Sequence, residues 1–339
     1  MIITQTPFRM SFFGGGTDME SFFKKYGGAV LSTTFDKYCY VNVRHLPRFF
    51  EYSTELSYSK TERVIDIQNI EHPAIRNAMK MLNMHEIRLT YEADLPARSG
   101  LGTSSSFAVG MLNAFYALKG EYADKKKLAD EAIYLERELC QEAGGWQDQI
   151  AASFGGFNRI NFNTDGTYDV LPIIISPERK KILNNNLMMF FTGFTRFSSD
   201  VQKASASTKE TRKEKEKRLL EMLSLVDKAE NILADRKSNL DEFGRMLDHT
   251  WNLKKQTGSA VSTNGIDALY DKAMKAGALG GKLLGAGGGG FLVFYVQPDY
   301  QDDVKRAMKD LMYIPFSFED GGTRVIHYTP ETYVPLEDK

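Results

Sequence analysis

The feature that most constrains the fold is the stretch LPARSGLGTSSS, residues 95–106, which runs directly into an apolar segment. Five of its side chains carry hydroxyl groups, namely Ser99, Thr103, Ser104, Ser105 and Ser106. The segment that follows, residues 107–118, is apolar on every side, which predicts a buried helix. The first N–H groups of such a helix have no partner inside it, and the helix dipole is positive there. The loop therefore predicts a phosphate site, with simple capping of the helix as the alternative.

The length of the chain predicts two domains. At 339 residues it exceeds the size at which a single hydrophobic core keeps growing. Pro177 and three consecutive asparagines, residues 184–186, indicate a domain boundary near residues 176–186. We therefore expect one domain over residues 1–180 and a second over residues 181–339.

Composition and charge exclude several classes of partner. A formal net charge of −1 gives no bulk attraction to nucleic acid or to an anionic membrane. The two cysteines, Cys39 and Cys140, lack C-x-x-C spacing, which is typical of reduced thiols. The N-terminus does not have the pattern of a signal peptide, and no stretch approaches the ~20 apolar residues of a membrane helix. We expect a cytoplasmic protein that binds small molecules, and a homodimer is left open.

A second glycine-rich run, GGGTD at residues 14–18, follows a predicted strand over residues 2–13. Its three glycines allow a sharp turn and a close approach of the backbone to another group. Asp18 suits the N-cap of a helix that starts at Met19. The alternative role for Asp18 is a carboxylate that contacts a ligand.

Candidate catalytic acids lie in the middle of the chain. Residues 125–142 predict a long amphipathic helix that carries Glu136, Glu138 and Glu142, although helix charges usually face solvent. The segment GGWQDQ, residues 144–149, follows. A carboxylate between a glycine pair and glutamines is unusual in a turn, which makes Asp148 a candidate functional residue.

A third glycine-rich run, GGKLLGAGGGG at residues 280–290, precedes a predicted strand. It contains the spacing G-x-G-x-x-G, but a dinucleotide site needs strand, glycines, then helix, whereas we expect helix, glycines, then strand. Leu283 stands where a P-loop needs a hydroxyl, and protein-kinase motifs and zinc spacings are absent. Three such loops in one chain suggest backbones that converge on one polyanionic ligand.

Together, these stretches resemble the three motifs of the GHMP kinase superfamily, which includes galactokinase, homoserine kinase and mevalonate kinase. Residues 7–18 resemble the first motif, residues 95–106 the second and residues 282–290 the third. Residues 144–149 resemble the segment that presents the catalytic Asp. The resemblance implies an α+β fold with a ribosomal S5-like N-terminal domain and a ferredoxin-like C-terminal domain, and an active site in the cleft between them.

The resemblance also implies an ATP-dependent kinase that uses Mg²⁺. It implies that Asp148 and Arg9 are catalytic and that Ser104 and Glu136 bind the metal, with Glu138 as the alternative acid. The implied ATP loop consists of Ser99, Gly100, Leu101, Gly102, Thr103, Ser104 and Ser105. The implied substrate-binding residues are Gly15, Gly16, Thr17, Asp18, Gly287, Gly288 and Gly289, together with Arg196.

The first motif narrows the range of possible acceptor sugars. Galactokinases carry G-E-H where this chain has three glycines, so the acid and the histidine that touch galactose are missing. The ending GGGTD is similar to that of the D-glycero-D-manno-heptose 7-phosphate kinases, which form the 1,7-bisphosphate. The alternatives are a fucokinase-like or galactokinase-like enzyme and a non-catalytic sugar and ATP sensor. The candidate cations for a substrate phosphate are Lys37, Arg98, Arg159, Arg196 and Lys282, and Arg196 is our choice.

Overall fold

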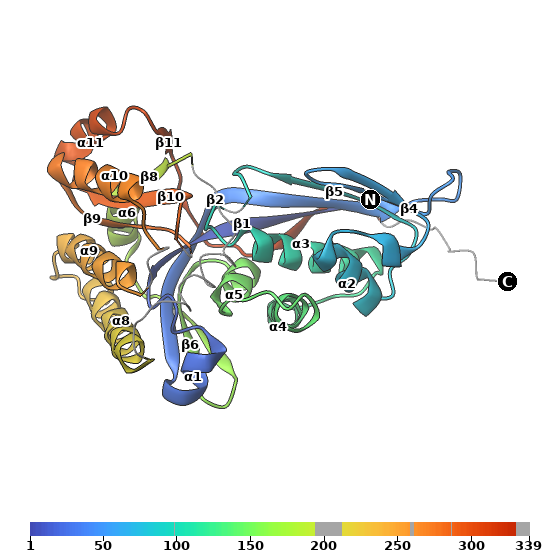
Figure 1. Cartoon of the computed structure of the whole chain (residues 1–339), viewed down its shortest axis with the longest axis horizontal. Helices are drawn as coiled ribbons and strands as arrows, with labels where there is room; N and C mark the ends of the chain where they lie inside the picture. Colours follow the sequence, from blue (N-terminus) through green and yellow to red (C-terminus); the bar gives the residue numbers. More distant parts are fainter. Residues whose placement is uncertain (98, 194–211, 258–260, 286, 330–339) are drawn as a thin grey trace.

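Two β-sheets with helices packed against them make up the described part of the computed structural model (Figure 1). The structure describes residues 1–97, 99–193, 212–257, 261–285 and 287–329. The larger sheet has nine strands, and the smaller sheet has four. This mixture of strands and helices confirms the expected α+β class.

Two long strands, β1 (Ile2–Phe13) and β2 (Gly28–His45), form the axis of the larger sheet. Strand β2 changes partner along its length. The first part of β2 pairs with β6 (Phe157–Phe162), and the last part pairs with β5 (Ile87–Ala93). This long strand connects the two ends of the sheet.

The apolar segment after the hydroxyl-rich loop forms helix α3 (Thr103–Leu118), as predicted, and packs against β1 and β2. Gly110 allows the close approach, because a Cβ atom there would lie 2.6 Å from Thr6 Oγ1. Thr4 Oγ1 donates a hydrogen bond to the Gly110 carbonyl at 2.9 Å. The loop is therefore fixed to the sheet through the helix that follows it.

Three other helices lie in the same layer as α3 and position the loops around it (Figure 1). They are α2 (Pro73–Met81), α4 (Lys125–Tyr134) and α5 (Gln147–Phe154). The helix predicted over residues 125–142 ends earlier in the structure. Helix α4 passes into a π-helical segment, Leu135–Leu139, and helical structure ends with that segment.

The smaller sheet has the strand order β11–β8–β10–β9 and is buried on both faces. Alternate residues of its central strand, β10 (Phe291–Val296), face opposite sides. Phe291 and Val293 pack in the core that includes the larger sheet, whereas Leu292 and Phe294 pack toward α10 (Asn264–Lys275). A strand buried on both faces explains why its sequence is continuously apolar.

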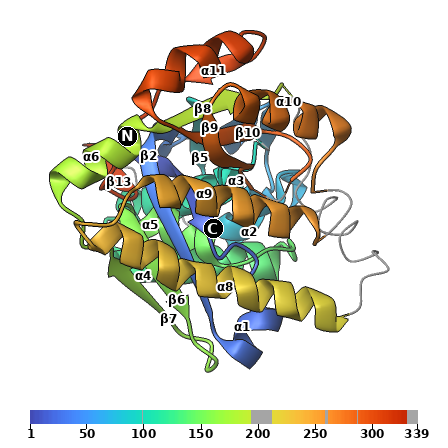
Figure 2. The same ribbon diagram turned by 90° about the vertical axis from the view of Figure 1, so that its left-hand side faces the viewer.

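Helices α8 (Arg212–Ala234) and α9 (Asp241–Lys255) lie side by side and join the two sheets (Figure 2). Phe243 of α9 makes edge-to-face contacts with Phe12 and Phe13 at the end of β1, with ring centroids 5.3 and 5.0 Å apart. Such aromatic pairs each contribute about 0.5–1.5 kcal/mol beyond their buried area. The end of β1 is thus held against the second half of the chain.

The remaining elements are short. The other helices are α1 (Glu20–Tyr26), α6 (Pro177–Asn185) and α11 (Gln301–Ala307). The other strands are β3 (Thr54–Ser57), β4 (Thr61–Val64), β7 (Tyr168–Pro172), β8 (Leu187–Phe191), β9 (Ala278–Leu283), β11 (Met312–Ile314), β12 (Phe318–Glu319) and β13 (Arg324–Tyr328). None of the described helices is long and apolar enough to span a membrane.

The segment around the expected domain boundary is helical, because residues 177–185 form α6. Ser176 caps this helix by accepting a hydrogen bond from the Arg179 N–H at 3.3 Å, and Pro177 occupies its first turn. The chain also returns at its end to the larger sheet, where β12 pairs with β2 and β13 pairs with β1. The boundary at 180/181 stays a prediction, and these last two strands cross it.

The third glycine-rich run connects β9 to β10 in an antiparallel hairpin, so the expected order of helix, glycines and strand is wrong. The dinucleotide pattern still fails, because a strand follows the glycines. Gly285 has φ +77° and Gly100 has φ +83°, and their backbones touch. A Cβ atom on Gly285 would overlap Gly100, so the two loops meet backbone to backbone.

The Gly285→Ala substitution tests this contact, with Gly120→Ala as a matched control. Gly120 has a similar φ, +73°, but no atom lies within 4 Å of the position that a Cβ would take there. Both variants lose about 1–2 kcal/mol from backbone strain. We expect Gly285→Ala to lose about 1–3 kcal/mol more in the free energy of unfolding, measured by urea titration, because its methyl group separates the loops. Equal losses in the two variants would contradict the contact.

Candidate active site

A paired arginine and aspartate lie at the centre of the site. Arg9 projects from β1, and Asp148 lies in the first turn of α5. Arg9 Nε donates to Asp148 Oδ1 at 2.8 Å, and Arg9 Nη2 donates to Oδ2 at 2.9 Å. The arginine is 5% exposed, whereas the Asp148 side chain is 25% exposed. This bidentate pair fixes the orientation of the carboxylate and leaves it accessible to a small molecule.

The same arginine also holds the hydroxyl-rich loop. Arg9 Nη1 donates to the Gly100 carbonyl at 2.7 Å, and the Arg9 N–H donates to the Leu101 carbonyl at 3.2 Å. A Cβ atom on Gly102 would lie 3.3 Å from Asp148 Oδ2. Asp148 is therefore beside the start of α3, where the sequence predicts a phosphate site.

The residues of the predicted ATP loop differ in their exposure. Ser104 is exposed, and Gly100 and Gly102 are partly exposed. The others are buried, namely Ser99, Leu101, Thr103 and Ser105. Ser99 Oγ is buried without a hydrogen-bond partner in the described structure.

Glu136 receives three hydrogen bonds from side chains of two other elements. Ser104 Oγ donates to Oε1 at 2.6 Å and Ser105 Oγ donates to Oε2 at 2.7 Å, and Gln149 Nε2 also donates to Oε2. Glu136 is 1% exposed, whereas Glu138 is exposed to solvent. The π-helical segment places Glu136 inward, in agreement with the frequent occurrence of such segments at functional sites.

The oxygen atoms around Glu136 fit a hard divalent cation. Ser104 Oγ and Glu136 Oε1 are adjacent, and Gln149 Oε1 is buried without a hydrogen-bond partner. Within the described ranges, no cluster of three or more His, Cys, Asp or Glu side chains could hold a metal on its own. One carboxylate and one hydroxyl match a Mg²⁺ that takes its other ligands from phosphates and water.

Asp18 lies beside Asp148 rather than on the helix that it was expected to cap. Helix α1 follows Met19 without a side-chain cap, so the N-cap prediction is wrong. Asp18 instead accepts hydrogen bonds from the N–H groups of Gly16, at 2.9 Å, and Gln147, at 3.3 Å. Burial raises the pKa of this carboxyl group, and the charge of Asp148 raises it further. The loop at residues 14–18 thus contacts the start of α5.

The side chain of Thr17 cannot contact a sugar, contrary to the prediction. It is fully buried, and its hydroxyl lies 2.8 Å from the Gly14 carbonyl and 2.9 Å from the Ala29 carbonyl. These contacts stabilise the turn that carries Gly16 and Asp18. Gly15 and Gly16 are partly exposed beside it.

Of the five cations considered for a substrate phosphate, three lie in the described ranges, and among these three Lys282 interacts with the charge of Arg9. Lys37 pairs with Asp36 at 3.1 Å, and Arg159 pairs with Asp227 and Glu230, each at 2.7 Å. Lys282 is 3% exposed and donates to the Phe12 carbonyl at 2.8 Å. Burial lowers the pKa of its ammonium group well below the usual value. Arg98 and Arg196 lie outside the described residues.

Lys254 was missed by the sequence analysis. It lies near the end of α9, partly exposed, and its ammonium group donates to the Gly285 carbonyl. Burial lowers its pKa to about 8, with a further contribution from Arg9, while Asp18 and Asp148 act in the opposite direction. The sequence did contain a sign, because Lys254 follows Leu247 and Trp251 at helical spacing on the buried face.

The two ends of the third glycine-rich loop lie against the hydroxyl-rich loop. Gly285 touches Gly100, and a Cβ atom on Gly290 would overlap the Ser99 carbonyl. Between these ends, the Gly288 N–H donates to the Val261 carbonyl at 3.0 Å, and Gly287 also packs against Val261. The expected contacts of Gly287, Gly288 and Gly289 with a substrate stay a prediction.

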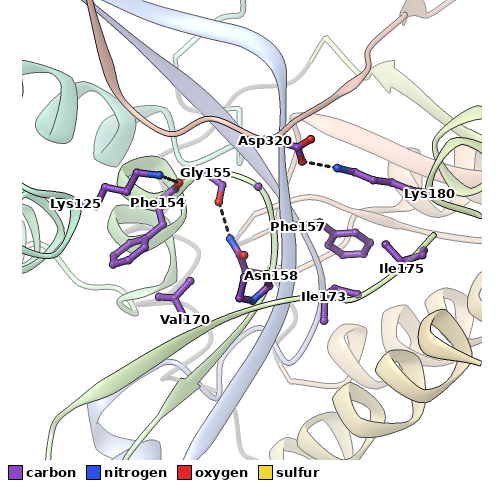
Figure 3. Close-up of a pocket in the computed structure, with 12 residues that line it drawn as sticks. Lys125, Phe154, Gly155, Phe157, Asn158, Val170, Ile173, Ile175, Lys180 and Asp320 are labelled. Atoms are coloured by element: carbon purple, nitrogen blue, oxygen red, sulfur yellow. Dashed lines mark hydrogen bonds and ion pairs between the residues drawn. The ribbon is translucent and has the colours of Figure 1, made fainter. Parts of the chain in front are cut away.

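A separate hollow of about 400 Å³ lies at the other end of α5 (Figure 3). Phe154, Gly155 and Phe157 line it, and Lys125 and Lys180 lie at its edges, where they bond to the Phe154 carbonyl and to Asp320. It shares no lining residue with the Arg9–Asp148 site. The convergence of charged groups and glycine loops, not the size of a hollow, therefore identifies the site.

Comparisons with known proteins match the chain to one family. Residues 69–156 match the family model for the GHMP kinases N terminal domain, and residues 229–314 match that for GHMP kinases C terminal. The chain is 29% identical over 338 residues to D-glycero-alpha-D-manno-heptose 7-phosphate kinase of Campylobacter jejuni, covering 95% of this chain and 98% of that protein. It is 30% identical over 229 residues to L-fucokinase/L-fucose-1-P guanylyltransferase of Bacteroides fragilis, covering 65% and 23% respectively.

Solved structures share the fold. A D-glycero-D-manno-heptose 1-phosphate kinase from Bacteroides thetaiotaomicron superposes with a TM-score of 0.78 and 24% identity, covering 96% of this chain and 99% of that one. A mevalonate kinase superposes with a TM-score of 0.71 and 18% identity, covering 94% and 99%. These matches confirm the fold that the three motifs predicted.

The raised pKa of Asp18 predicts how an Asp18→Asn variant responds to pH. A carboxyl group with a raised native pKa binds protons in the folded state that the unfolded chain has released, so wild-type stability falls as pH rises above about 3.8. The asparagine does not ionise. We therefore expect the melting temperature of Asp18→Asn, relative to wild type, to rise between pH 4 and pH 7. A constant difference over this range would show that the Asp18 pKa is not raised.

Proposed function

The chain belongs to the GHMP kinase family, and we propose that it transfers the γ-phosphoryl group of ATP to the anomeric hydroxyl of D-glycero-D-manno-heptose 7-phosphate. The product would be the 1,7-bisphosphate. One observation carries the proposal: Arg9 joins the phosphate loop and Asp148 in a single hydrogen-bonded unit. The similarity to the heptose 7-phosphate kinase over nearly the whole chain supports the choice of acceptor.

Asp148 is the proposed catalytic carboxylate. Phosphoryl transfer requires an oriented acceptor, an in-line donor and neutralisation of phosphate charge. The guanidinium of Arg9 holds both Asp148 oxygens, so the carboxylate keeps one orientation toward the acceptor hydroxyl. It would accept the hydroxyl proton, or orient the hydroxyl, as the new O–P bond forms.

ATP phosphates would bind at the loop that ends in α3. The exposed positions, Gly100, Gly102 and Ser104, lie at the N-terminus of this helix, which favours an anion. Arg9 and Lys254 add positive charge on the side that faces Asp148. The adenosine portion of ATP is not placed by these residues.

Mg²⁺ would be held by Ser104 Oγ and Glu136. Bound there beside the phosphates, it would neutralise charge on the β- and γ-phosphates. We choose Glu136 over Glu138, because Glu136 points at Ser104 and Glu138 points to solvent. Ser105 and Gln149 hold the second carboxylate oxygen and so fix the direction of the first.

On the acceptor side, Asp18 would accept hydrogen bonds from sugar hydroxyls, with Gly15, Gly16 and the loop at residues 287–289 close to the sugar. We keep Arg196 as the proposed partner of the substrate phosphate. The second candidate acceptor is L-fucose, because the chain is also similar to a fucokinase over 229 residues.

An acceptor panel tests the function. We expect ADP release, followed with a coupled assay, only with the heptose 7-phosphate, and a ³¹P signal for a phosphate on the anomeric oxygen of the product. The panel includes L-fucose, galactose and mevalonate. The matched control is Asp148→Asn, which keeps the size of the side chain but cannot accept a proton, and we expect it to lose at least about 100-fold in kcat.

Two results would contradict the proposal. Turnover with fucose but not with the heptose phosphate would assign the second candidate acceptor. Most of the wild-type kcat in folded Asp148→Asn would remove Asp148 from the catalytic role.

Ser104→Ala tests the proposed metal site. Removing this hydroxyl takes one oxygen ligand from Mg²⁺ and leaves Glu136 held by Ser105 and Gln149. We expect the Mg²⁺ concentration for half-maximal rate to rise by about tenfold or more. Ser106→Ala is the control, because Ser106 Oγ bonds to the Pro7 carbonyl inside the protein, at 3.0 Å. An unchanged Mg²⁺ dependence in Ser104→Ala would place the metal elsewhere.

A further inference from the structure

Two lysines of the site lie close to Arg9 without an acidic partner within salt-bridge distance among the described residues. The ammonium group of Lys254 donates to the Gly285 carbonyl, and that of Lys282 donates to the Phe12 carbonyl. A carbonyl oxygen satisfies a hydrogen bond but does not neutralise a charge. A buried cation without a counter-ion is costly, so its persistence needs a reason.

Geometry leaves Lys254 without a neutralising partner. Asp148 is already paired with Arg9 by two hydrogen bonds, and Asp18 accepts its hydrogen bonds from the N–H groups of Gly16 and Gln147. Burial lowers the pKa of Lys282 well below its usual value, so Lys282 contributes less positive charge. An anion bound beside Lys254 would balance its charge.

The two lysines differ in position, and their roles differ accordingly. Lys282 is 3% exposed and its ammonium group is turned toward the backbone of β1, so it supports the sheet contact. Lys254 is partly exposed, and it bonds to Gly285, the residue whose backbone touches Gly100 of the phosphate loop. It also lies close enough to Asp18 and Asp148 to interact with their charges. Lys254 is thus between the predicted donor loop and the predicted acceptor carboxylates.

We propose that Lys254 is a further catalytic residue, whose ammonium group contacts the phosphoryl group during its transfer from ATP to the acceptor. This inference rests on the proposed function. In the step, the bond between the γ-phosphorus and the bridging oxygen breaks, and a bond to the acceptor oxygen forms. The acceptor proton goes to Asp148, and ADP leaves with the bridging oxygen. Lys254 exchanges no proton and stabilises the charge on the moving group.

The groups around Lys254 make the charge of its ammonium group dependent on pH. The charged groups that face it are Arg9 from β1, Asp18 from the loop after β1, Asp148 from α5 and Lys282 from β9. With a pKa of about 8, Lys254 in the free enzyme loses its proton as pH rises through 8. We therefore expect kcat/KM for ATP to fall above pH 8 in the wild-type enzyme.

The test compares Lys254→Met and Lys254→Arg with Lys255→Met. Lys255 is the next residue on α9, but its ammonium group lies 3.6 Å from Asp267, away from the site. We expect Lys254→Met to lose at least about 100-fold in kcat, with less than about tenfold change in the calorimetric Kd for ATP. Lys254→Arg should retain more activity and lose the decline above pH 8, because a guanidinium stays charged. Lys255→Met should match wild type.

Three results would overturn the assignment. The first is a kcat for folded Lys254→Met within threefold of wild type. The second is a loss confined to KM for the sugar phosphate, which would place Lys254 on the phosphate of the acceptor. The third is an unchanged alkaline decline in Lys254→Arg, and this result decides the matter even where Lys254→Met does not fold.

Failure of the proposed function gives a different pattern. In that case the wild-type enzyme turns over none of the heptose phosphate, whatever the state of Lys254. The lysine variants are then compared in slow hydrolysis of ATP by water, or with the acceptor from the panel that wild type does use. A loss in Lys254→Met there supports the role of Lys254 without the heptose substrate.

Discussion

The site depends on one side chain, Arg9, because its guanidinium bonds to two segments that are distant in the sequence. It holds Asp148 by two hydrogen bonds and the Gly100 carbonyl by a third. A planar guanidinium with fixed donors suits this task, since a lysine at the same place could not hold both carboxylate oxygens and a carbonyl in one geometry. The orientation of the proposed catalytic carboxylate and that of the hydroxyl-rich loop are therefore not independent.

Around this unit, the protein brings three glycine-rich loops together by different physical means. The first loop ends in Asp18, which bonds to the start of α5. The second enters α3, a helix fixed to β1. The third touches the second where Gly285 meets Gly100 without side chains between them. Aromatic contacts between Phe243 and the end of β1 hold the two halves of the chain in the register that these loops require.

The local sequence predicted much of the fold and of the candidate site, and the predictions that were wrong have physical causes. The buried helix α3, the strand β1 and the acid Asp148 follow from patterns that tertiary contacts do not alter. Glycines misled us at β9, because pairing with the neighbouring strand overcomes weak local preferences. The π-helical turn that separates Glu136 from Glu138 has no local sequence sign that we recognised.

The sequence by itself determined the class of chemistry, because the spacing within each motif and the order of the motifs are properties of the chain alone. The tertiary structure decided which groups meet. Asp18 joins Asp148 and does not cap α1, and Thr17 turns inward. Lys254 lies more than 100 residues along the chain from either aspartate. Electrostatic interactions act through space over a few ångströms, so a partly buried cation that faces two carboxylates cannot be recognised until the chain has folded.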